Sequence, residues 1–156
     1  MHLWEQVKEI KIQTGAEITG NFSLGFDSEI PEETRLWLTE FVDWVEAHYP
    51  IPITLWVDFK YNHYLVTRDK RRVGYKFYWA DFEHYPFFER EEDIPVIELP
   101  VRTEYWSMEE ILASFIEAIT HYFAWLTNQI TEGFQPDYAQ VEEILQKYLH
   151  SREETT

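Results

Sequence analysis

The sequence of 156 residues contains no cysteine, which excludes a disulfide framework and a thiolate as nucleophile or metal ligand. This absence fits a cytoplasmic protein. No run of about 18 apolar residues occurs, so we expect no membrane-spanning helix. The opening MHLWEQVKEI carries charges throughout and lacks the apolar region of a signal peptide.

Basic residues are scarce: 13 Lys and Arg stand against 29 Asp and Glu, a formal net charge of -16. Binding to the phosphate backbone depends on basic side chains that displace counterions, so we expect no direct contact with nucleic acid. Acidity of this degree commonly serves solubility. It also matches the surface of a basic protein partner.

The hydrophobic content of 45% and aromatic content of 18% predict a compact globular chain. We expect a single α+β domain over residues 1–150 and a frayed tail over 151–156. Its sheet, antiparallel or mixed, has three to five strands packed with three main helices. Helices are predicted at 31–49, 107–130 and 141–149, strands at 17–27, 53–59 and 96–101, and a hairpin at 61–82. Residues 3–14 fit either a short helix or a strand.

The longest predicted helix begins with a capping-box pattern, in which Ser107 is followed three residues later by Glu110. Apolar residues then recur at helical spacing for about six turns. The opposite face carries Glu117 and His121, which are neighbours because they stand four residues apart. The residues alone leave two interpretations open. One is an exposed ion pair worth about 0.2–0.5 kcal/mol, and the other is a metal or binding site.

The segment ILASFIEAITHYFAWL resembles the active-site helix of small zincin metallopeptidases, particularly the compact SprT-like and phage-encoded forms. In that family the helix follows a β-sheet and carries HExxH, which supplies two zinc-binding imidazoles and a general base. The resemblance places His121 at the second histidine, with Tyr122 and Trp125 at the aromatic positions that follow it. It places Glu117 at the first histidine and Ala118 at the general base. A methyl group cannot activate water, so the resemblance implies a degenerate, non-catalytic relative.

The predicted strands carry more aromatic residues than one face of a sheet can bury. We expect some of them to form a patch suited to protein contact, bordered by the acidic loop that follows. The predicted partner-binding residues are Trp56, Tyr64, Tyr78, Trp79, Glu91, Glu92 and Asp93.

These observations favour a non-catalytic acidic module that binds a protein, such as an immunity, antitoxin or accessory factor, and that needs no cofactor. One alternative is a metal-dependent hydrolase using Glu117, His121 and a carboxylate of the last helix. Such ligands would hold a divalent ion weakly and would suit a harder ion than zinc. Another alternative is an acidic mimic of nucleic acid. The sequence indicates no oligomeric state.

Overall fold

The computed structural model describes residues 3–14, 21–49, 51, 54–61, 74–80, 94–127 and 136–154. The chain forms one α+β arrangement in which the part described contains four helices and a four-stranded mixed sheet. The elements are α1 (Leu3–Thr14), β1 (Phe22–Phe26), α2 (Glu32–His48), β2 (Leu55–Lys60), β3 (Lys76–Ala80), β4 (Ile94–Pro100), α3 (Met108–Leu126) and α4 (Tyr138–Glu154). The predicted α+β class, strand number and mixed sheet are confirmed. The predicted hairpin lies largely outside the described residues.

The sheet has the strand order β1-β2-β4-β3. The first three strands in this order are parallel, and β3 pairs with β4 in the antiparallel direction. Alternating burial along β2 follows from the two-residue period of a strand. Leu55, Val57 and Phe59 are buried on the inner face, whereas the residues between them are half-buried on the outer face.

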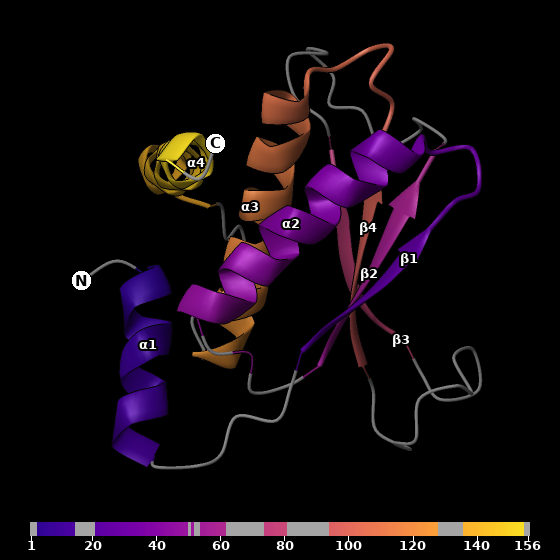
Figure 1. Ribbon diagram of the computed structural model, residues 1–156. Helices are drawn as coiled ribbons and strands as arrows, with labels where there is room; N and C mark the ends of the chain where they lie inside the picture. Colours follow the sequence, from indigo (N-terminus) through magenta and orange to yellow (C-terminus); the bar gives the residue numbers. More distant parts are fainter. Residues whose placement is uncertain are drawn as a thin grey trace.

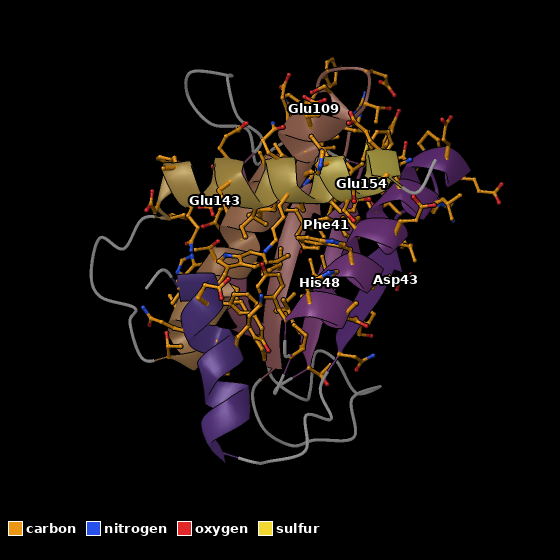
Figure 2. All side chains as sticks on the ribbon, turned by 60° about the vertical axis from the view of Figure 1, so that its left-hand side comes forward. Phe41, Asp43, His48, Glu109, Glu143 and Glu154 are labelled. Carbon is orange, nitrogen blue, oxygen red and sulfur yellow. The ribbon has the colours of Figure 1, made fainter. Side chains whose placement is uncertain are left out.

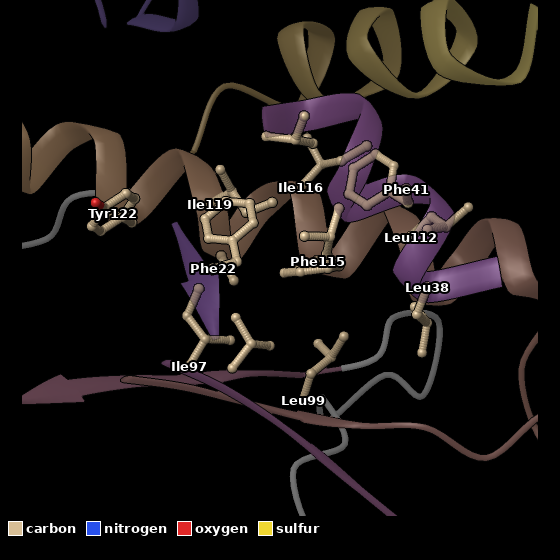
Figure 3. Packing of buried hydrophobic residues seen from close by; sticks show 14 of the residues in the cluster. Phe22, Leu38, Phe41, Ile97, Leu99, Leu112, Phe115, Ile116, Ile119 and Tyr122 are labelled. Carbon is tan, nitrogen blue, oxygen red and sulfur yellow. The ribbon is translucent and has the colours of Figure 1, made fainter. Parts of the chain in front are cut away.

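All four helices lie on one side of the sheet, with α2 and α3 nearest to it and α1 and α4 beyond them (Figure 1). Ile97 and Leu99 of β4 face Phe115 of α3 across this interface (Figure 3). The Phe115 ring meets the ring of Phe41 at 5.5 Å and that of Phe59 at 5.3 Å, both edge to face. The core therefore joins α2, α3 and the sheet, and it sets which face of α3 points toward the sheet.

Residues 3–14, which the sequence left open between a short helix and a strand, form the helix α1. Trp4 and Val7, one helical turn apart, are both fully buried. The Trp4 indole N–H donates to the hydroxyl of Thr120 on α3 at 2.8 Å, and its ring packs edge to face on Phe123. The two buried residues stand at helical spacing, so a helix places both on the same side of the segment. This explains why the segment forms a helix that packs against α3.

The predicted frayed tail is wrong for residues 151–154, because α4 continues to Glu154. Arg152 pairs with Glu40 of α2 at 3.1 Å, and its guanidinium lies 3.8 Å from the centre of the Trp37 ring. These contacts between α4 and α2 hold the last helical turn. No helix in the described part of the chain is long and apolar enough to cross a lipid bilayer.

Candidate functional site

The helix α3 begins where the capping pattern predicts: the Ser107 hydroxyl accepts a hydrogen bond from the Glu110 N–H at 3.1 Å. Its predicted apolar face is buried in the core. The opposite face is also buried along most of its length, because α4 packs over it. Ser114 is 3% exposed and Glu117 is 9% exposed. The interpretation of Glu117 as half of an exposed ion pair is therefore wrong.

Glu117 lines a pocket of about 190 Å³ between α3 and α4. Glu110 and Glu142 are exposed side chains that border the same pocket, one from each helix. The complete lining is Glu110, Ala113, Ser114, Glu117, Tyr138, Val141 and Glu142. The pocket thus combines three carboxylates and two hydroxyl groups with the small apolar surfaces of Ala113 and Val141.

His121 lies one turn beyond Glu117 and faces the edge strand β3. Its Nδ1 is 3.2 Å from the hydroxyl oxygen of Tyr75, directly before β3, and its ring centre is 5.0 Å from that of Phe77. His121 is half-buried by these contacts. Burial lowers the pKa of His121 below its ordinary value of 6.5, because desolvation disfavours the imidazolium.

The electrostatics show that the pocket and the histidine belong to one polar region. Burial, followed by the charge of Glu117 and the hydroxyl of Tyr138, raises the pKa of Tyr75 far above its usual range. Tyr75 is therefore a neutral hydroxyl at physiological pH. The sequence predicted Glu117 and His121, whereas their neighbours Tyr75 and Tyr138 come from distant segments that no local motif connects to α3.

A metal site in this region would need a set of at least three ligands. Within the described ranges, no group of three or more His, Asp or Glu side chains is placed to hold a metal ion. Glu117 shares the pocket with Glu142 of the last helix, as the hydrolase alternative requires, but His121 does not line that pocket. The geometry of the described residues thus does not support the predicted weak metal site at Glu117 and His121.

Of the seven predicted partner-binding residues, the structure describes the side chain of Trp56 alone. Trp56 is half-buried on the outer face of the sheet, where Gly25 of β1 packs against it. A Cβ at Gly25 would lie 3.0 Å from the Trp56 ring and 2.8 Å from Asp58 Oδ1, so a larger residue here would require these side chains to shift. The backbone of Tyr78 and Trp79 lies in β3, while Tyr64, Glu91, Glu92 and Asp93 fall outside the described residues.

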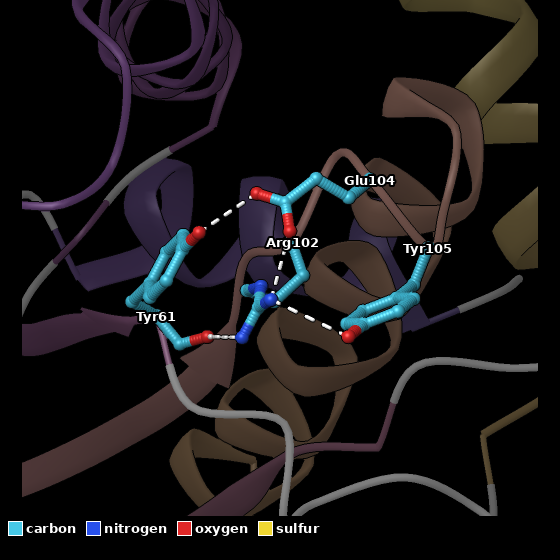
Figure 4. Close-up of polar contacts among 4 residues, drawn as sticks. All are labelled: Tyr61, Arg102, Glu104 and Tyr105. Carbon is cyan, nitrogen blue, oxygen red and sulfur yellow. Dashed lines mark hydrogen bonds and ion pairs between the residues drawn. The ribbon is translucent and has the colours of Figure 1, made fainter.

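A second polar cluster, which the sequence interpretation missed, stands after the carboxyl ends of β2 and β4 (Figure 4). The Arg102 guanidinium lies 4.1 Å from the Tyr61 ring centre and 4.7 Å from that of Tyr105. It pairs with Glu104 at 2.8 Å, and Glu104 also accepts a hydrogen bond from the Tyr61 hydroxyl at 2.7 Å. Ligands often bind at this edge of parallel strands. Here Arg102 is held by groups of its own chain, so the cluster joins two strand ends.

Exposed carboxylates also lie on α2, α3 and α4. Figure 2 shows Asp43 on α2, Glu109 on α3, and Glu143 and Glu154 on α4 at the periphery of the helical layer, while Phe41 lies between the helices. All four carboxylate residues are exposed. Negative charge is thus spread over the surface of the helical layer.

Comparisons of the chain with protein-family models, with curated proteins and with solved structures found no match.

Proposed function

We propose that this chain is a non-catalytic, acidic protein-binding module on a scaffold that resembles the small zincin metallopeptidases. Its partner is a basic protein, and its role is of the kind filled by immunity proteins, antitoxins or accessory factors. The observation that carries the proposal is the acidic pocket between α3 and α4, whose buried carboxylate Glu117 stands where the zincin motif has its first histidine.

The residues around the pocket favour binding over chemistry. Ala118, at the position of the zincin general base, is fully buried and has no group that can activate water. His121 contacts the Tyr75 hydroxyl and the Phe77 ring instead of lining the pocket. Catalysis through this pair would need a third ligand, and the described residues supply no such set.

The charge of the molecule supports a basic partner. A net charge of -16 attracts a cationic surface over distances set by the Debye length, about 8 Å at physiological ionic strength. Complementary charge increases the rate of association and discriminates against acidic partners. The exposed carboxylates on α2, α3 and α4 extend this attraction beyond the pocket itself.

The proposal is tested by capture with the immobilised full-length protein from lysate of its source cells, followed by binding measurements on each purified protein recovered. We expect a basic protein that is retained uncleaved, with an affinity that falls steeply as NaCl is raised. Failure to recover a basic protein, or an affinity insensitive to salt, contradicts the proposal.

A second measurement addresses catalysis. Purified protein is assayed for zinc and manganese content and for cleavage of an unstructured protein substrate with each ion added. Near-stoichiometric metal that is lost on His121→Ala, accompanied by cleavage, would overturn the non-catalytic assignment in favour of the hydrolase.

A further inference from the structure

We infer that the outer edge of β1 receives an extended segment of the basic partner, which adds to the sheet as a further strand. The inference rests on the proposed basic partner but not on the pocket between α3 and α4. In the strand order β1-β2-β4-β3, β1 lies at the opposite edge from β3, the strand beside His121. An edge strand presents a row of backbone N–H and C=O groups with which another chain can pair.

The hydrogen bonds at the two ends of β1 show which of its residues turn outward. The Asn21 carbonyl accepts a bond from the first residue of β2 at 3.2 Å, and the Asp27 N–H donates to a carbonyl of β2 at 3.0 Å. Backbone groups of successive residues in a parallel ladder point to opposite sides of the strand. The groups of Phe22, Leu24 and Phe26 therefore point away from β2.

Only the first part of this outward row is occupied. The Phe22 N–H donates to the Glu46 carboxylate of α2 at 3.0 Å, and the Phe22 carbonyl accepts from the Asn21 side-chain amide at 3.3 Å. Within the described ranges, no group bonds to the outward N–H and C=O of Leu24 or of Phe26. Both donors and both acceptors of these two residues thus remain for an added strand.

The strand itself lacks the features that usually protect an edge. Its sequence FSLGF has no charged residue and no proline. The side chains of Leu24 and Phe26 are half-buried on the inner face, where the Phe26 ring stacks on that of Phe59 at 4.8 Å. Their exposed parts offer contact to apolar residues at alternate positions of an added strand.

Charge at the two ends of β1 favours a basic occupant. The Glu46 carboxylate lies at Phe22, and Asp27 and the exposed Glu29 follow the last residue of the strand. Arg35, a basic side chain at this turn, donates to two backbone carbonyls of the turn. A second copy of the chain on this edge would bring like carboxylates together, whereas a basic segment would meet opposite charge.

The test uses the peptide acetyl-KVKVKVK-amide as the probe and ¹⁵N-labelled full-length protein in low-salt buffer at pH 7. We expect saturable shifts in the amides of residues 22–27. At saturation, the Leu24 and Phe26 amides should exchange with water at least about tenfold more slowly, because they gain hydrogen bonds. The amides of Ser23 and Gly25, which already face β2, should change less. The peptide acetyl-EVEVEVE-amide should not bind.

Backbone methylation of the probe tests strand pairing directly. One peptide carries N-methyl groups on every valine and another carries them on every lysine. Because alternate N–H groups of an added strand face β1, exactly one of the two peptides should lose binding. Loss with the valine peptide indicates antiparallel pairing, and loss with the lysine peptide indicates parallel pairing. Retention by both peptides, or loss by both, would overturn the inference.

Two variants at one position localise the site on the protein. Leu24→Pro removes an outward N–H that does not serve the ladder with β2, and it should weaken the probe's binding by at least about fivefold. Leu24→Val keeps the N–H and is the matched control, with binding within about twofold of the unaltered chain. If Leu24→Pro does not fold, the methylated peptides decide the question with the unaltered protein.

Sedimentation equilibrium of the unaltered chain addresses the other occupant. A dimer that Leu24→Val retains and Leu24→Pro loses would assign the edge to a second copy and overturn the inference. A captured basic protein whose affinity is the same for Leu24→Pro and Leu24→Val would overturn the inference alone. Failure to capture any basic protein contradicts the proposed function, whatever the peptide does.

Discussion

His121 is an unusual residue in this fold because a group that titrates near neutrality is held against aromatic rings. Its Nδ1 faces the Tyr75 hydroxyl and its ring lies beside Phe77. Desolvation in this position lowers the pKa of His121 below 6.5. The folded chain therefore resists protonation of this imidazole more than the unfolded chain does.

This difference predicts a pH-dependent stability. Because the folded-state pKa of His121 is the lower one, its contribution is fully present above about pH 6.5 and is lost as the pH falls through the folded-state pKa. We expect the urea midpoint of the unaltered chain to fall more between pH 7.5 and 5.5 than that of His121→Gln. The loss cannot exceed about 1.4 kcal/mol per pH unit for one proton.

His150→Gln serves as the control for His121→Gln. His150 lies at the surface of α4 with its side chain 73% exposed, paired with Glu154. A change of slope that appears in His121→Gln and not in His150→Gln assigns the effect to the imidazole held against Tyr75 and Phe77. Equal slopes for the unaltered chain and His121→Gln would contradict the assignment of the effect to the buried imidazole.

At the scale of elements, one buried hydrogen bond joins α1 to α3. The Trp4 indole N–H donates to Thr120, whose hydroxyl donates in turn to the carbonyl of Ile116 at 2.7 Å. Thr120→Val preserves the shape and leaves the indole N–H buried without an acceptor. We expect a loss of about 1–3 kcal/mol in the free energy of unfolding, measured with urea.

Thr39→Val is the matched control for Thr120→Val. The Thr39 hydroxyl also donates to the carbonyl four residues earlier, that of Arg35 at 2.8 Å, but lies on the half-buried side of α2. Its replacement should cost less than about 0.5 kcal/mol. In a double-mutant cycle, Trp4→Phe and Thr120→Val should be non-additive, and strict additivity would show that the bond does not couple the two helices.

The helix α3 also shows how far the sequence predicts this structure. Its start, apolar face and neighbouring pair Glu117 and His121 follow from local spacing, and each is present. Periodicity reveals which residues share a face, but it does not show what covers that face. The spacing therefore left open whether Glu117 is exposed, and the packing of α4 against α3 decides that it is buried. The parallel pairing of β1, β2 and β4, and the approach of Tyr75 to His121, depend on long-range contacts that spacing does not encode.

At the scale of the whole molecule, charge is distributed unevenly between the interior and the surface. The core that joins the sheet to α2 and α3 is apolar, and most of the charged side chains that the structure describes lie at the surface. The ion pairs Lys8–Glu5 and Arg152–Glu40 are partly exposed, and pairs of this kind contribute about 0–1 kcal/mol each. With a net charge of -16, we expect repulsion among carboxylates to outweigh such pairs and to oppose the compact state.

Salt should therefore stabilise this protein. Raising NaCl from about 10 mM to about 0.3 M shortens the Debye length from roughly 30 Å to below 8 Å and screens repulsion between distant carboxylates. We expect the melting temperature at pH 7 to rise by at least about 2 °C, the shift that roughly 1 kcal/mol produces in a domain of this size. The same titration near pH 5, closer to the sequence isoelectric point of about 4.6, is the control and should give a smaller rise, because the net charge is lower there. A melting temperature that falls with salt at pH 7 would mean that the ion pairs dominate, and it would contradict a surface governed by self-repulsion.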